Sequence, residues 1–426
     1  MNRKPALVLL ALALAFALWG PKLYGYLDMM VLVPTFIFLV LAVTTLGIRV
    51  PRDIYAVSAL IALTIVVWVS FSILINGATN LQGVLRSIRA LVTLLVLFPV
   101  FYFAAQQKLL SMNIAFRLLT IVLFINTLAI YAQVLYVPLQ DVMAPIWGFD
   151  KPTRNFRAFG LTAGYDSAGF LAALLAASAL SASLILRSWR WFLFFIVCAG
   201  AVGFTSRSSM VLLYGLILTV FFVSKSDWRN NGTRLLVLIT TGVSVFVWYM
   251  LPRISSGVLE LTTYPVYHEN DYSLYFAKTS LFDVLEKMVV FPKELGTWVI
   301  GNGLSVPWSD VGYVKVVYLG GIPLLALMFL FYGYLFFVSR AAVKLLLKSG
   351  EIYLNDKGWA RVWLKLLLML LLVMVFGNLK NLYFSSRGYH EIFIISSALM
   401  LGFCKGQIVA RRANGIDGGY RSCGKG

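Results

Sequence analysis

Residues 253–310 read RISSGVLELTTYPVYHENDYSLYFAKTSLFDVLEKMVVFPKELGTWVIGNGLSVPWSD and form the only long polar stretch of the chain. Apolar runs of bilayer length precede and follow it. Its ionisable side chains include His268, Glu269, Asp271, Lys278, Asp283, Glu286, Lys287, Lys293, Glu294 and Asp310, among several aromatic rings. So many charges would be expensive within hydrocarbon. The stretch therefore predicts a large loop, residues 252–311, that lies outside the bilayer between two sets of membrane helices.

The composition places the rest of the chain in a membrane. Of the 426 residues, 60% are hydrophobic and 12% are charged, which is more apolar surface than a soluble fold can bury. We expect one integral membrane domain over residues 1–426. The net charge of +19 does not indicate a nucleic-acid partner, because the cations lie in short loops between apolar runs, as membrane orientation requires. Cys198, Cys404 and Cys423 form no metal-binding or disulfide pattern.

Apolar runs of about 20 residues predict spanning helices. The expected fold is an all-α polytopic bundle of about twelve such helices, with the large loop between the ninth and the tenth. The first run follows Arg3 and Lys4 as in a signal peptide, but the many further runs favour a retained helix. The predicted spans are 5–20, 29–47, 54–76, 87–105, 112–136, 167–186, 190–205, 208–223, 234–251, 312–338, 361–379 and 390–404.

Lysine and arginine predict the orientation of these helices. With the N-terminus inside, the predicted inner loops are rich in cations, and an even number of spans returns the C-terminus to the same side. We therefore expect a multi-pass protein with both termini cytoplasmic. The predicted outer segments are 137–166, 252–311 and 380–389.

The predicted outer side also carries cations that orientation does not require: Arg86, Arg89, Lys151, Arg154, Arg157, Arg207, Arg253, Lys278, Lys287, Lys293, Lys315, Lys380 and Arg387. Some reach the headgroups from helix ends, and an anionic ligand on the outer face is the simplest reason for the others. The middles of the predicted spans hold almost no ionisable residues. Ion-coupled transporters place such groups near the midplane, so we expect the chemistry at the outer interface.

Two outer arginines stand in turns rich in glycine or serine. Arg157 lies in NFRAFGLTAGYDSAG, residues 155–169, where glycines permit tight turns near a ligand and Asp166 or the following serine can cap a helix. Arg207 lies in GFTSRSS, residues 203–209, between two short predicted helices, where a charge needs a partner. A guanidinium binds phosphate through two parallel hydrogen bonds, so both turns favour a phosphate ligand. The alternatives are an arginine bound to lipid headgroups and an ordinary hairpin arginine.

Two further outer motifs carry acids and a histidine. In GNGLSVPWSDVGY, residues 301–313, Asp310 and Tyr313 share one face of the helix that begins there. Asp310 is either a helix cap or a group that binds a sugar hydroxyl or takes its proton. In KNLYFSSRGYHE, residues 380–391, two cations stand beside His390 and an acid, which are either functional or a helix start. The two histidines of the chain are far apart, so no metal site is expected.

In this order, the motifs resemble the bacterial O-antigen polymerase and O-antigen ligase superfamily. The matching elements are Arg157 to Gly160 before a helix, the turn Thr205 to Arg207, and a large outer loop. The loop closes with Gly301 and Gly303, then a polar residue, Asp310, begins a helix, and Gly320 and Gly321 follow within that helix. The order covers most of the chain.

The resemblance implies a GT-C-like helical membrane fold at the bacterial plasma (inner) membrane. It implies transfer of a glycan from undecaprenyl diphosphate at the outer face, without metal or cofactor, and with inversion at the sugar. Arg157 and Arg207 would hold the diphosphate. From its own chemistry and position, Asp310 is expected to act on the acceptor. The predicted substrate-binding residues are Arg154, Asp166, Tyr313, Lys380, Arg387 and His390. The expected partners are lipid-linked glycans, the bilayer and a membrane protein that regulates chain length.

Three alternatives differ in what the chain would do. The ligase branch has a functional histidine near the end of the large loop, where this chain has WSDVGY, residues 308–313. That departure favours a Wzy-type polymerase of O-antigen, capsule or exopolysaccharide over a WaaL-type ligase that moves the glycan to another acceptor. A flippase for lipid-linked oligosaccharides, from another class, would carry charge deep in a central cavity and need no large outer loop.

Overall fold

The computed structural model describes residues 3–23, 27–44, 48, 50–78, 81–147, 157–162, 164–223, 290–303, 311–348, 354–379 and 388–413. Within these ranges the chain forms thirteen helices and one antiparallel hairpin of two strands. The helices are α1 (Arg3–Trp19), α2 (Met29–Thr44), α3 (Arg52–Ile75), α4 (Gln82–Gln106), α5 (Met112–Leu135), α6 (Pro138–Trp147), α7 (Tyr165–Leu186), α8 (Trp189–Val202), α9 (Arg207–Val223), α13 (Leu295–Val299), α14 (Gly312–Lys348), α15 (Leu354–Gly377) and α16 (Tyr389–Ala413). The strands are β1 (Lys22–Leu23) and β2 (Leu27–Asp28).

The prediction of an all-helical, multi-pass membrane protein is confirmed. Seven helices, α3, α4, α5, α7, α14, α15 and α16, are long and apolar enough to cross a membrane, and each lies on a predicted span. Four shorter apolar helices, α1, α2, α8 and α9, lie on four more predicted spans. The predicted span 234–251 lies outside the described residues, so the total of twelve stays a prediction.

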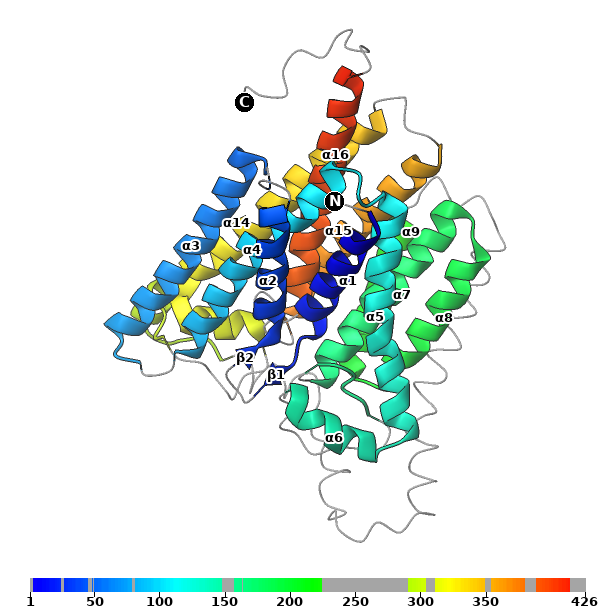
Figure 1. The fold of residues 1–426 in the computed structure, drawn as a ribbon. Helices are drawn as coiled ribbons and strands as arrows, with labels where there is room; N and C mark the ends of the chain where they lie inside the picture. Colours follow the sequence, from blue (N-terminus) through cyan, green and yellow to red (C-terminus); the bar gives the residue numbers. More distant parts are fainter. Residues whose placement is uncertain are drawn as a thin grey trace, which may run out of the picture.

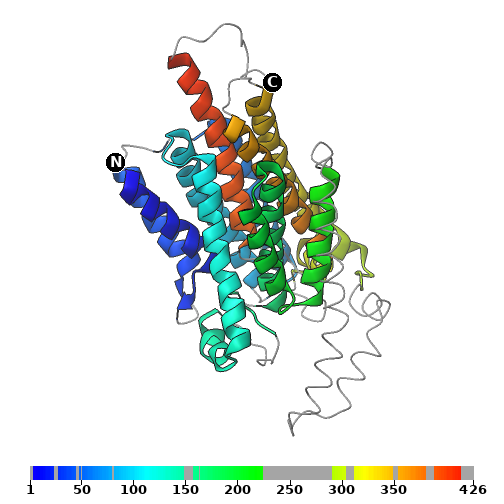
Figure 2. The ribbon, with the colours of Figure 1, turned by 90° about the vertical axis from the view of Figure 1, so that its right-hand side faces the viewer.

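The two ends of the bundle differ (Figure 1). The N-terminal end of α1 and the C-terminal end of α16 lie at one end, and Figure 2 shows the same arrangement from the side. The β1–β2 hairpin and α6 lie at the opposite end, which we call the hairpin end. The arrangement agrees with an even number of crossings. By the lysine and arginine distribution, the hairpin end is the predicted outer end.

Helices α7 and α16 form the inside of the bundle. α7 packs against α5, α8, α9 and α15, while α16 packs against α4, α14 and α15. The buried length of α7 is rich in alanine and serine, and small side chains let membrane helices approach closely. At Gly169 of α7, an added Cβ would lie 2.0 Å from the hydroxyl oxygen of Thr205. α7 therefore needs a residue without a side chain at this contact.

Helix α14 is interrupted, although the sequence predicted one continuous span. Gly320 and Gly321 have non-helical backbone angles. Their region is bonded to α3, because Ser72 Oγ donates to the Leu319 carbonyl at 2.7 Å and Trp68 Nε1 donates to the Gly320 carbonyl at 2.7 Å. These bonds satisfy carbonyls that the break withdraws from helical bonding. The break is thus a fixed part of the bundle.

Candidate functional site

The segment after Arg157 is held by the side chain of Gln133, which is buried at the end of α5. Gln133 Oε1 accepts the backbone N–H groups of Phe159, at 3.0 Å, and Gly160, at 2.9 Å. Its Nε2 donates to the Gly160 carbonyl at 2.8 Å. One amide thus replaces the backbone partners that this non-helical segment lacks.

Two more buried amides complete this support. Asn126 Oδ1 accepts from Leu161 N at 2.9 Å, and Gln140 Nε2, from α6, donates to the Arg157 carbonyl at 2.8 Å. Gly160 has a φ of 57°, and a Cβ there would lie 2.2 Å from Asn126 Oδ1. Only glycine suits this position. The backbone that carries Arg157 is therefore fixed before any ligand binds.

Arg157 is itself only half-buried. Its guanidinium carbon lies 5.9 Å from the centre of the Tyr165 ring, a distance typical of a cation–π contact. Among the described residues, no carboxylate forms an ion pair with it. The ring orients the charge without neutralising it, so the charge can bind an anion.

The turn that precedes Arg207 lies directly beside this segment. Ala158 N donates to the Phe204 carbonyl at 2.8 Å. On the next helix, Ser208 Oγ donates to Asp166 Oδ1 at 2.6 Å. The structure thus brings the backbones of Arg157, Asp166 and Arg207 together from separate parts of the sequence. The side chain of Arg207 lies outside what the structure describes.

Three helices begin at this place. α7 begins at Tyr165, α9 at Arg207 and α16 at Tyr389. The Tyr389 hydroxyl donates to the Ser167 carbonyl at 3.1 Å, which joins α16 to α7. Helix N-termini carry partial positive charge and favour anions. Acids already lie in the first turns of α7, Asp166, and α16, Glu391, whereas the first turn of α9 has none. The start of α9 and the side chain of Arg157 are therefore the parts of this corner that would attract a phosphate.

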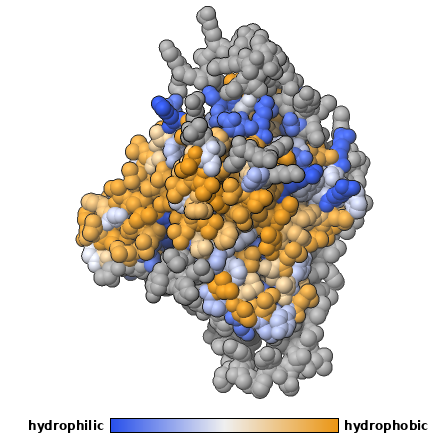
Figure 3. Space-filling model, viewed as in Figure 1, coloured by the Kyte–Doolittle hydropathy of each residue, from blue (hydrophilic) through white to orange (hydrophobic). Residues whose placement is uncertain are grey.

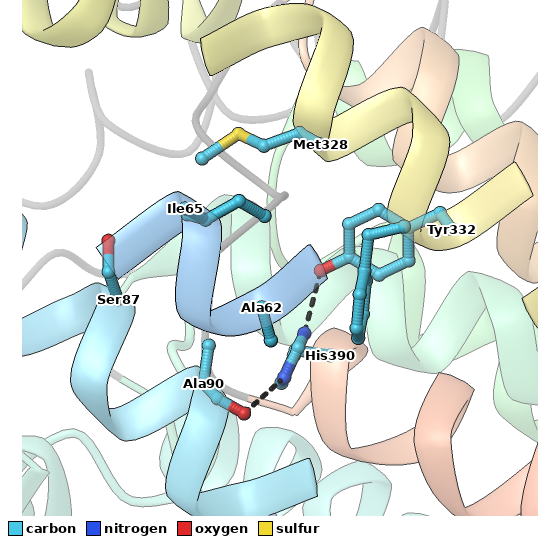
Figure 4. Close-up of a pocket in the computed structure, with 8 residues that line it drawn as sticks. Ala62, Ile65, Ser87, Ala90, Met328, Tyr332 and His390 are labelled. Atoms are coloured by element: carbon cyan, nitrogen blue, oxygen red, sulfur yellow. Dashed lines mark hydrogen bonds between the residues drawn. The ribbon is translucent and has the colours of Figure 1, made fainter. Parts of the chain in front are cut away.

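His390 lies in a second cluster, inside the bundle (Figure 4). Its Nε2 lies 3.0 Å from the Ala90 carbonyl, and its Nδ1 lies 2.7 Å from the Tyr332 hydroxyl. A carbonyl can only accept, so Nε2 carries the proton and Nδ1 accepts from Tyr332. Arg89 and Glu391 lie near enough to interact electrostatically with the Tyr332 hydroxyl.

A small cavity adjoins this His390 cluster. Its volume is about 30 Å³, which holds one or two water molecules. It is lined by Ala62, Ile65, Ser87, Ala90, Met328, Phe331, Tyr332 and His390. The adjacent Glu391 accepts the N–H of Gly388 at 2.7 Å, as an acid in the first turn does when it caps a helix. This bond agrees with the helix-start interpretation of the acid.

Of the remaining predicted site residues, the structure describes two, Tyr313 and His390. The Tyr313 hydroxyl donates to the Val375 carbonyl, and Tyr313 N donates to the Asn378 carbonyl at 3.3 Å, so this residue joins α14 to the end of α15. No described contact joins Tyr313 to Arg157. His390 is buried rather than placed on an exposed turn. Arg154, Asp310, Lys380 and Arg387 lie outside the described residues.

Sequence reasoning missed the three amides and Tyr332. Asn126, Gln133 and Gln140 stand seven residues apart, and on a helix such spacing puts Asn126 and Gln133 on one face. That spacing within an apolar run was the available signal, because a buried amide requires partners. The sequence around Tyr332 offered no such signal, since tyrosine is common in membrane helices.

No protein-family model matches the chain, and no curated protein matches it. Within the described ranges, no three His, Cys, Asp or Glu residues gather as metal ligands. Metal independence stays a prediction.

Proposed function

We propose that this protein is a polysaccharide polymerase with a GT-C-like fold that joins repeat units carried on undecaprenyl diphosphate at the outer face of the bacterial plasma membrane. One observation carries the proposal. The rigid Arg157 segment and the turn before Arg207 lie side by side, where three helices begin at the predicted outer end. A lipid-linked diphosphate would present its charge at this depth.

In the proposed reaction, a hydroxyl of the acceptor glycan attacks the anomeric carbon of the donor from the side opposite the diphosphate. The new bond joins the acceptor oxygen to that carbon, and the bond from the carbon to the diphosphate oxygen breaks. The diphosphate leaves with the electron pair, and the sugar inverts. Arg157 and Arg207 stabilise the charge that develops on the leaving group, while Asp310 takes the proton of the hydroxyl.

Asp166 has a narrower role in this proposal. Its Oδ1 accepts from Ser208, which leaves its other oxygen to bind a sugar hydroxyl. A carboxylate would repel a diphosphate, so we assign Asp166 to the glycan. The bond to Ser208 fixes the direction of the carboxylate.

Substitution of the two arginines tests the proposal. We expect Arg157→Lys and Arg207→Lys each to lower transfer about a hundredfold, the usual effect of removing one preorganised donor, since lysine lacks the planar fork. Asp310→Asn should spare donor binding and lower transfer. The measurements are polymer length in cells and donor binding with purified protein, each corrected for membrane expression.

Arg190→Lys is the matched control, because Arg190 is exposed in the first turn of α8 at the opposite end of the bundle. It should behave as the wild type. Polymer of normal length from both Arg157→Lys and Arg207→Lys would contradict the proposal that these arginines bind the diphosphate. Polymer of normal length from Asp310→Asn would show that Asp310 acts only as a helix cap.

The glycan profile of a deletion strain separates the rival activities. Products with a single repeat unit support a polymerase. Long chains that stay on the lipid carrier indicate a ligase, and lipid-linked units retained in the cytoplasm indicate a flippase. The cavity beside His390, at about 30 Å³, is far too small for an oligosaccharide and gives the flippase no support.

A further inference from the structure

Helix α6 has an unusual place in the bundle. Its 10 residues make it about 15 Å long, half of the roughly 30 Å that a spanning helix must cross. It lies across the hairpin end, below the longer helices (Figure 1). Its inner face packs on the bundle mainly through apolar contacts, since Met143 packs with Phe159 and Tyr165. This face covers the segment that carries Arg157.

The outer face of α6 is also apolar, yet no described residue covers it. Pro138, Val142, Pro145 and Ile146 are all exposed and follow the spacing of one helical face. Val142 is 65% exposed and Ile146 37% exposed. Figure 3 shows hydrophobic colour on the surface over α6. An apolar face of this kind on a soluble surface would require a partner.

The neighbouring surface indicates that partner. Ile121, Ile125 and Leu128 are exposed on α5, a helix long and apolar enough to cross the bilayer. Two further exposed side chains extend this surface to the end of α5: Leu135 is 86% exposed and Tyr136 is 62% exposed. The outer face of α6 therefore continues the surface that lipid covers.

The two ends of α6 carry the residues that favour a membrane interface. Tyr136 precedes the helix and Trp147 ends it, and both residue types gather where headgroups meet acyl chains. Asp141 is the one charged residue of the helix. It is exposed next to the apolar stripe, as at the water-facing edge of an interfacial helix.

We propose that α6 is an interfacial helix, with Val142 and Ile146 embedded at the boundary of headgroups and acyl chains in the leaflet at the hairpin end. Gln140, on its inner face, donates to the Arg157 carbonyl. The bilayer thereby fixes the depth of Arg157 relative to the lipid headgroups. This inference stands whether or not the protein is a polymerase, because it rests on α6 and its neighbours alone.

Lipid quenching tests the inference in the full-length protein. The three native cysteines are replaced by serine, and Val142→Cys is labelled with bimane in nanodiscs, which leave both faces open to solvent. We expect loss of fluorescence with lipids brominated near the headgroup end of the acyl chain, and little loss with aqueous iodide. Asp141→Cys, one residue away, is the matched control and should respond more strongly to iodide.

Ile146→Cys provides a second probe if the first variant folds poorly, and it should repeat the result of Val142→Cys. Strong iodide quenching at both sites would place the helix in water and overturn the inference. Quenching by neither agent would show that protein covers the face, which overturns it equally. The readout needs no glycan substrate, so its failure and that of the proposed function are distinguishable.

Discussion

The oxygen and the nitrogen of the Gln133 side-chain amide form hydrogen bonds with two consecutive residues, Phe159 and Gly160. Gln133→Leu leaves two N–H groups and one carbonyl without this partner, and each unsatisfied buried group costs about 1–3 kcal/mol. We expect a clearly lower unfolding temperature in detergent and faster tryptic cleavage at Arg157. Gln107→Leu is the control, because Gln107 is exposed at the end of α4. Unchanged cleavage at Arg157 would show that the amide does not hold the segment.

The bond between Asp166 and Ser208 separates a structural role from a binding role. Asp166→Ala and Ser208→Ala both break it, and we expect their effects on unfolding to be coupled by about 0.5–3 kcal/mol in a double-mutant cycle. If Asp166 also binds glycan, Asp166→Ala lowers transfer more than Ser208→Ala does. Equal losses of transfer would leave Asp166 a purely structural residue.

At the scale of elements, the closeness of α7 and α9 depends on Gly169. An alanine there would press on Thr205 and Ser209, and overpacking of this kind costs about 1–3 kcal/mol. Gly169→Ala should therefore unfold at lower temperature than the wild type. Gly215→Ala, in α9, meets nothing within 4 Å and should gain up to about 1 kcal/mol from helix propensity. The same sign for both variants would contradict the described packing.

Hydropathy predicted the elements better than it predicted their interruptions. Span length identified α7 and α16, because both need an unbroken apolar run to cross a bilayer. It missed the break at Gly320 and Gly321, since the residues on both sides are equally apolar and the satisfying bonds come from α3. It also missed α6, which is too short for a span and contains Pro145.

The site was predictable only in part, for a related reason. Glycines and serines around Arg157 and Arg207 marked two turns, and a shared ligand was the reason to expect them together. Contacts such as Ala158 to Phe204 join residues distant in sequence, and no local pattern encodes them. The prediction for His390 failed because a position at a helix start suggests exposure, whereas α16 packs between α4 and α14 and the ring bonds to residues of both helices.

At the scale of the whole molecule, orientation is the most general prediction. Reporter fusions at Asn155 and Ser256 should report outside, and fusions at Ser349 and Gly415 should report inside. The reason is the excess of lysine and arginine in the predicted inner loops. A cytoplasmic report at Ser256 would put the lipid-linked donor on the wrong side of the membrane and overturn the proposed function.

The buried amides of α5 also impose an order on synthesis. Asn126 and Gln133 leave the ribosome ahead of Leu161 and Gly160, their partners, so α5 reaches the membrane before the segment that satisfies its amides. For a time on the order of seconds, α5 therefore presents two unsatisfied amides to lipid or to the insertion machinery. A released chain that ends before Gly160 cannot pair them in this way. Such a chain is a substrate for membrane quality control, and α7 is the helix whose arrival ends that exposure.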